Sequence, residues 1–115
     1  MATITATTLA GSAARTVTRT TLGSSDTFTF NASKNPILVL DNVTAGALTV
    51  VIDGASATTQ TVAGIGVIDL SAGYSTGSIA AGACVAIPLT TISSYLTGVI
   101  AVTGGSGMKA TLFEY

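Results

Sequence analysis

The side chains of this 115-residue chain that can do acid–base or metal chemistry are few and scattered. There is no histidine, which removes the usual general base and the commonest metal ligand. The five carboxylates are spread along the chain: Asp26, Asp41, Asp53, Asp69 and Glu114. Three of them, Asp41, Asp53 and Asp69, can meet in space, but no loop has the ligand spacing of a calcium site. Because a serine or threonine nucleophile also has no visible base, we expect no catalytic residue, no metal and no cofactor.

Two other features with chemical potential are better explained by structure. A single cysteine excludes an internal disulfide, and Cys84 lies in the apolar run 83–87, which predicts a small buried side chain. Gly64-Ile-Gly66 lacks the third glycine and the following helix of a nucleotide-binding loop. These glycines instead indicate a bulge or a close approach of the backbone.

The composition predicts a β protein with an unusually uncharged surface. Threonine, valine and isoleucine account for 40 of the 115 residues, and β-branched side chains fit strands better than helices. The formal net charge is −1, so there is no basic field for nucleic acid or for an anionic membrane. No run approaches the ~20 apolar residues of a membrane span. A surface with so few charges repels its neighbours weakly, which favours a protein that works inside an assembly.

The most concentrated apolar stretch, Asn35–Gly54, is expected to organise the fold. Its runs Ile37–Leu40 and Leu48–Ile52 are separated by turn-forming residues, so they are predicted to be two central strands of a hydrophobic hairpin. Since the first run is apolar on both faces, it is expected either to be buried on both or to lie between a sheet and an oligomer contact.

The remaining segments predict further short strands and one helical turn. Strand-like runs recur at a spacing of about 8–12 residues, which is typical of sandwiches and small barrels. The spacing of Leu89, Ile92 and Leu96 before Gly98 predicts a short helical turn near residues 90–96. Gly104–Gly107 is predicted to be a hairpin tip. The fold class is therefore all-β, a compact β-sandwich or small barrel of about eight or nine short strands.

Residues 1–14 are predicted to form an extended N-terminal arm in front of a single β domain, residues 15–115. Residues 2–14 are rich in Ala and Thr, and Ile4 and Leu9 are their only large apolar residues, too few to anchor a core strand well. The arm is expected to become ordered by docking on a partner. The alternative is an ordinary edge strand of its own domain.

Two further candidate sites for partners lie in the domain itself. Arg15 and Arg19 flank Val17 on one face of a predicted strand. They suit an edge strand, where charge blocks stray pairing, or a contact patch for acidic groups. Tyr74 lies in a glycine-bracketed loop, residues 71–78, and has the apolar body and polar tip of an interface anchor. Its alternative role is to cover one end of the core.

Taken together, the chain resembles the capsid decoration, or cement, proteins of tailed bacteriophages. The resemblance is carried by Ala2–Leu9, by Asn35-Pro-Ile-Leu-Val-Leu-Asp-Asn42 and by Ile79-Ala-Ala-Gly-Ala-Cys-Val-Ala-Ile-Pro-Leu89. It implies a β-rich, often trimeric domain that is made in the bacterial cytoplasm and binds the outside of the virion's shell. The implied partner is the major capsid protein. The N-terminal candidates for pairing with its strands are Thr3, Ile4, Thr5, Thr7 and Leu9.

Two other functions remain open at this point. One is a different virion component, such as a tail or head–tail joining protein. The other is a carbohydrate- or host-surface-binding module that uses Tyr74, Tyr95 and Tyr115. If the arm serves attachment, deleting Thr3–Leu9 is expected to leave the domain folded and to weaken its binding to shells.

Overall fold

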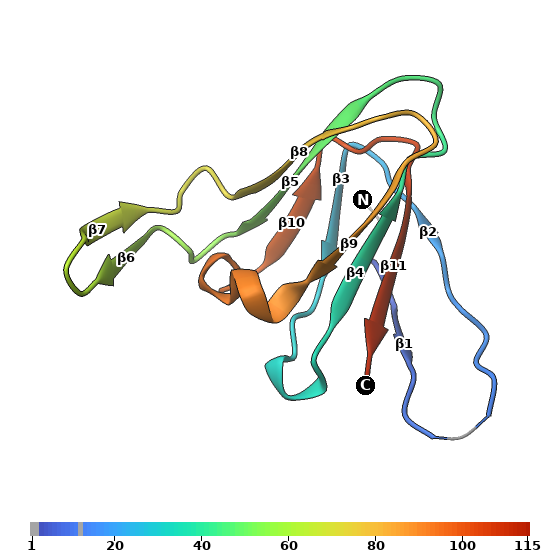
Figure 1. The fold of residues 1–115 in the computed structure, drawn as a ribbon, viewed down its shortest axis with the longest axis horizontal. Helices are drawn as coiled ribbons and strands as arrows, with labels where there is room; N and C mark the ends of the chain where they lie inside the picture. The colour runs from blue at the N-terminus through green and yellow to red at the C-terminus, as the bar shows by residue number, and fades with distance from the viewer. Residues whose placement is uncertain (1–2, 12) are drawn as a thin grey trace.

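Two facing β-sheets and a separate hairpin make up the computed structural model, which describes residues 3–11 and 13–115 (Figure 1). The five-stranded sheet contains β1 (Ala6–Thr8), β11 (Lys109–Glu114), β4 (Ile37–Asp41) and β9 (Cys84–Pro88), with β2 (Thr20–Thr21) also paired to β11. The four-stranded sheet contains β3 (Ser25–Phe28), β10 (Ile100–Thr103), β5 (Leu48–Gly54) and β8 (Tyr74–Ile79). The hairpin consists of β6 (Thr59–Val62) and β7 (Gly66–Asp69), and the two 3-10 helices are η1 (Ala32–Lys34) and η2 (Leu89–Tyr95).

The strand order is that of a jelly roll. Strands that follow one another along the chain mostly lie in opposite sheets, so the neighbours within a sheet are distant in sequence. β2, β11, β4 and β9 are antiparallel in one sheet, and β3, β10, β5 and β8 are antiparallel in the other. These two sets of four strands, connected in this way, form the double Greek key of a jelly-roll sandwich. β1 is an additional strand of the five-stranded sheet. The predicted all-β sandwich is confirmed, and η2 is the predicted helical turn.

The core between the sheets follows the apolar alternation of the strands. Leu38 and Leu40 of β4 and Val50 and Ile52 of β5 have no exposed surface and belong to one buried cluster. Successive side chains of a strand point to opposite faces, so the residues between them lie on the outer faces. Each such burial contributes about 1.5–3 kcal/mol, and the stretch Asn35–Gly54 organises the fold as predicted.

The predicted hairpin between these two strands is wrong, because β4 and β5 lie in different sheets. The turn between them is an arch that carries the chain from one sheet to the other. Gly104–Gly107 likewise joins β10 to β11 in the opposite sheet, and is an arch rather than a hairpin tip. In both places, each strand buries one apolar face against the other sheet, and this packing decides the pairing.

A buried asparagine holds the first arch in place. The side chain of Asn42 is fully shielded from solvent, and its Nδ2 donates hydrogen bonds to the carbonyls of Gly46, at 2.9 Å, and Ile79, at 2.8 Å. Its Oδ1 accepts from the backbone N–H of Thr44, at 3.1 Å, and from the Thr44 hydroxyl, at 2.6 Å. One side chain therefore ties the end of β4 to the arch and to β8 of the other sheet.

Three local expectations are corrected. The strand predicted from Arg15 is reduced to β2, because residues 15–19 are exposed and bury no face. Cys84 is exposed rather than buried, since the alternation of β9 turns Ile87 inward and Cys84 outward. The loop predicted around Tyr74 is largely strand β8. In the part of the chain described, no helix is long and apolar enough to cross a membrane.

The two sheets end on one side in β8 and β9; β8 contains a bulge and β9 ends in a proline. The pairing of β8 with β5 shifts register between Thr49 and Val51, where Gly77 has a φ of 75°. At this position the N–H of Val50 donates a hydrogen bond to the Thr76 hydroxyl oxygen at 3.2 Å. β9 ends at Pro88, which has no N–H to offer a further strand. A bulge and a proline are common devices for blunting a sheet edge.

Candidate interaction surfaces

The described residues contain no cluster that suggests catalysis or metal binding. No group of three or more cysteine or carboxylate side chains converges in residues 3–11 and 13–115. Asp26 is buried and accepts a hydrogen bond from the N–H of Gly23 at 2.8 Å, so it shapes the turn before β3.

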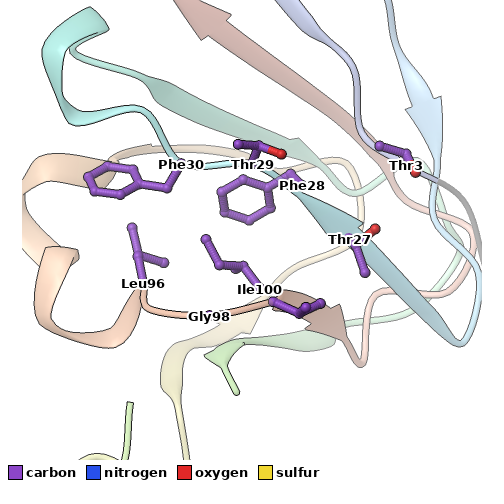
Figure 2. A pocket seen from close by; sticks show the side chains of 9 residues that line it. Thr3, Thr27, Phe28, Thr29, Phe30, Leu96, Gly98 and Ile100 are labelled. Atoms are coloured by element: carbon purple, nitrogen blue, oxygen red, sulfur yellow. The ribbon is translucent and has the colours of Figure 1, made fainter. Parts of the chain in front are cut away.

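A surface hollow lies beside the end of β3 and has a volume of about 440 Å³. Figure 2 shows the side chains of Phe28, Phe30, Leu96 and Ile100 pointing toward one another across it. Threonines 3, 27 and 29 supply the hydroxyl groups at its rim, and no charged side chain lines it. The described lining of this hollow is therefore apolar, with hydroxyl groups at its rim.

The N-terminal segment lies on its own domain. Thr3 forms a parallel bridge with Thr27 of β3, and the N–H of Ile4 donates to the Thr27 carbonyl at 2.8 Å. A few residues later, β1 pairs in parallel with β11. Ile4 is 2% exposed and belongs to the core cluster. The structure thus shows the alternative of a strand in its own domain, and the segment links the edges of both sheets.

The other arm candidates divide between the two faces of this segment. Thr7 is buried, and its Oγ1 accepts a hydrogen bond from the N–H of Thr18 at 3.1 Å. Thr3 and Thr5 are exposed, as is Leu9, whose N–H donates to the Glu114 carbonyl at 2.7 Å. Only the exposed residues of the segment are open to a partner.

The two arginines do not share a strand face. Arg15 donates from its guanidinium to the carbonyl of Ala10 in the segment that leads to β2. Arg19 forms a salt bridge with Asp41 of β4 at 3.0 Å, with side chains that are half and one-third exposed. An exposed pair of this kind contributes at most about 1 kcal/mol. Both arginines therefore serve local order at the edge of the five-stranded sheet.

Tyr74 covers one end of the core. It is half-buried, packs against the core cluster and meets Tyr95 edge to face, with ring centroids 6.0 Å apart and planes at 64°. A sugar-binding platform needs an open aromatic face, whereas these two rings are turned against each other. The arrangement favours the covering role of Tyr74 over the interface anchor and over the tyrosine-based sugar site.

The sequence did not predict that the β6–β7 hairpin forms an exposed apolar surface. In Figure 1, β6 and β7 project from the sandwich as a continuation of β5 and β8. Ile65 is 74% exposed, Val67 is 70% exposed and Ile68 is 37% exposed. An isolated two-stranded hairpin is marginally stable in water, so large aliphatic groups at its tip indicate a contact. The available signal was the apolar residues Ile65, Val67 and Ile68 in a short stretch that also contains Gly64 and Gly66.

The outer faces of the two sheets differ in chemistry. Ile37, Val39 and Phe113 lie side by side on the outer face of the five-stranded sheet and are partly exposed. The corresponding face of the four-stranded sheet carries mainly threonine and serine, including Thr49 and Thr103. The two-faced apolar run Ile37–Leu40 therefore meets the core on one side and forms a shallow apolar surface on the other.

The base of the hairpin is fixed by Asp69, whose carboxylate accepts from the Ser71 hydroxyl at 2.6 Å and from the Ser71 N–H at 2.9 Å. These bonds hold the pKa of Asp69 below its ordinary value of 3.8. Replacing Ser71 by alanine removes the hydroxyl bond, so the pKa of Asp69 is expected to rise toward 3.8, measured by NMR titration. Ser106→Ala, a change at an exposed serine elsewhere, is the control.

The sign of the associated pH dependence follows from the lowered pKa. Ionised Asp69 favours the folded state above the unfolded pKa, and this contribution disappears as the pH falls through the folded pKa. An unchanged Asp69 titration in the Ser71→Ala variant would contradict the assignment.

Comparisons of the chain with protein-family models, with curated protein sequences and with solved structures found no match. The surfaces described above are therefore the basis for a functional proposal.

Proposed function

We propose that this protein is a structural, non-enzymatic component of a tailed-phage virion that binds the outside of the capsid and stabilises the head. The observation that carries the proposal is the projecting hairpin with Ile65 and Val67 at its tip, 74% and 70% exposed. In a monomer this apolar surface stays in water. Seated on a shell, it gains the free energy of burial, about 25 cal/mol per Å².

Three further properties support an assembly role. The surface carries few charges, so neighbouring copies repel one another weakly. The outer face around Ile37 and Phe113 offers a second apolar contact. Jelly rolls are used by viral capsid and lectin domains, although fold by itself does not fix function. On this proposal the partner is the major capsid protein, and symmetry repeats a modest contact many times.

The test replaces the hairpin tip. The double variant Ile65→Thr/Val67→Thr keeps β-branched side chains and removes most of the apolar surface. Losing the burial of two aliphatic side chains, about 3 kcal/mol, corresponds to roughly a hundredfold weaker attachment. Heads assembled without the protein would be incubated with the wild type or with the variant, and the attached copies counted by gel densitometry.

A matched control lies on the same hairpin. Thr59→Ser/Thr61→Ser changes two exposed residues and removes only one methyl group from each, so it is expected to attach nearly like the wild type. Because all four positions are solvent-exposed or nearly so, each change is expected to alter folding stability by no more than about 0.5 kcal/mol. Normal attachment of the Ile65→Thr/Val67→Thr variant would refute the role of the hairpin.

Imaging of particles with and without the protein tests the location. Copies spread across the shell support head decoration, and loss of these copies should make the head more fragile on heating. A single ring at one vertex would instead identify a head–tail or tail component and would overturn the decoration proposal.

A further inference from the structure

The N-terminal segment, residues 3–8, is attached to the rest of the domain by a long exposed linker. Residues 9–19 connect β1 to β2, and every described residue among them is exposed. Among the described residues of the linker, the Arg15 and Arg19 side chains make surface hydrogen bonds, and the N–H groups of Leu9 and Thr18 tie its two ends to Glu114 and Thr7. Figure 1 shows this part of the chain running well away from the sheets before it returns as β2.

The linker is much longer than its connection requires. Thr8 pairs with Glu114 and Thr20 with Ala110, so the two ends of the linker meet β11 four residues apart. At about 3.3 Å per residue, this separation is about 13 Å along the strand. The twelve residue steps from Thr8 to Thr20 reach about 40 Å when extended. This length is comparable with the 44 × 37 × 23 Å dimensions of the molecule.

The site that receives the segment is a gap between the two sheet edges. β3 offers the carbonyl of Thr27 on one side, and β11 offers its C-terminal half, from Leu112 to Glu114, on the other. Between them, Ile4 enters the core cluster. The site thus takes backbone pairing, the Ile4 side chain and the smaller buried contacts of Ala6 and Thr7, and residues 3–8 of any copy of this chain provide all of these.

We propose that copies of this protein exchange their N-terminal segments, so that residues 3–8 of one copy fill the gap between β3 and β11 of another. The contacts of the exchanged and closed forms are then identical, and concentration decides between them. A segment on a flexible linker reaches its own site at an effective concentration of roughly millimolar. Exchange therefore prevails where copies are crowded, and the closed form prevails in dilute solution. This inference does not depend on the proposed function.

Mixing two single-cysteine variants tests the exchange. In a Cys84→Ser background, one chain carries Thr8→Cys and the other, which has an affinity tag, carries Glu114→Cys. These residues are paired neighbours in the structure. Both chains are unfolded together and refolded at about 10 µM, far below the effective concentration, or at about 1 mM, close to it, and are then oxidised. A disulfide between the two chains is expected to form efficiently only at the higher concentration.

The control pairs the Thr8→Cys chain with Ser106→Cys, an exposed residue in the arch at the other end of β11. Exchange predicts that the Glu114→Cys chain is crosslinked about tenfold more than this control at the higher concentration. Equal crosslinking of both chains at both concentrations would overturn the proposal.

Shortening the linker gives an independent readout. Without residues 10–17, four residue steps reach only about 13 Å, which leaves no length for the chain to reverse direction. Such a chain is expected to form a dimer or larger oligomer by light scattering. A folded monomer with a buried Ile4 would contradict the exchange.

Discussion

Replacing Asn42 by alanine is expected to lower the free energy of unfolding by about 2–4 kcal/mol. The fully buried amide donates to the carbonyls of Gly46 and Ile79, and it accepts two hydrogen bonds from Thr44. Alanine leaves the buried carbonyl of Ile79 without this partner and removes three part-buried hydrogen bonds to Gly46 and Thr44. A buried group left unsatisfied costs about 1–3 kcal/mol. In a domain whose total stability is about 5–15 kcal/mol, the loss is visible as a lower urea midpoint with an unchanged slope.

The chain contains its own control for this substitution. The Oδ1 atom of Asn31 accepts from the N–H of Ser33, at 3.3 Å, and from the Ser33 hydroxyl, at 2.7 Å. The local motif is the same as at Asn42, but Asn31 is exposed, so water can replace the lost bonds. Asn31→Ala is therefore expected to cost less than about 1 kcal/mol. If the two variants lost similar amounts of unfolding free energy, the buried hydrogen bonds of Asn42 would not be what holds β4, the arch and β8 together.

Replacing Ile4 by alanine is expected to destabilise the domain by about 2–4 kcal/mol, the usual range for truncating a buried isoleucine. Ile4 is 2% exposed and fills the gap between β3 and β11. Thermal and urea unfolding of the purified protein measure the effect. By the same reasoning, deleting Thr3–Leu9 should weaken folding, whereas the sequence had predicted an arm that could be removed without harm.

Leu9 is the matched control for Ile4. It is the other large apolar residue of the N-terminal segment, but its side chain is exposed. Leu9→Ala is expected to change stability by no more than about 0.5 kcal/mol. If Ile4→Ala also left the unfolding midpoint unchanged, the segment would not be part of the core, and the expectation of an arm that docks elsewhere would regain its support.

The strands were largely predictable from sequence, whereas their partners were not. The apolar runs Ile37–Leu40 and Leu48–Ile52 were predicted to be central strands, and they supply Leu38, Leu40, Val50 and Ile52 to the core. The turn between β4 and β5 has the same residue chemistry whether the strands pair in one sheet or face each other across two. Only packing against distant strands decides this, so an arch was read as a hairpin.

The surfaces were less predictable for a related reason. A count of apolar residues undervalued the N-terminal segment, because a single side chain, Ile4, suffices to plug the gap between two sheet edges. Ile65–Ile68 was likewise taken for an ordinary strand of the sandwich, but in the structure it pairs only with β6, in a separate two-stranded sheet. Sequence shows which segments are apolar, but three-dimensional packing decides which of them remain in water.

The outer strands, β8 and β9, have a consequence for the colloidal behaviour of the protein. A chain with so few charged residues has little electrostatic protection against fibril growth, in which open strands stack edge to edge. Here the bulge at Gly77 in β8 and the proline that ends β9 make these two edge strands poor partners for a further strand, because of their backbone geometry. Geometry is insensitive to salt and pH, so this protection is expected to hold when the protein accumulates to high concentration in a crowded cell.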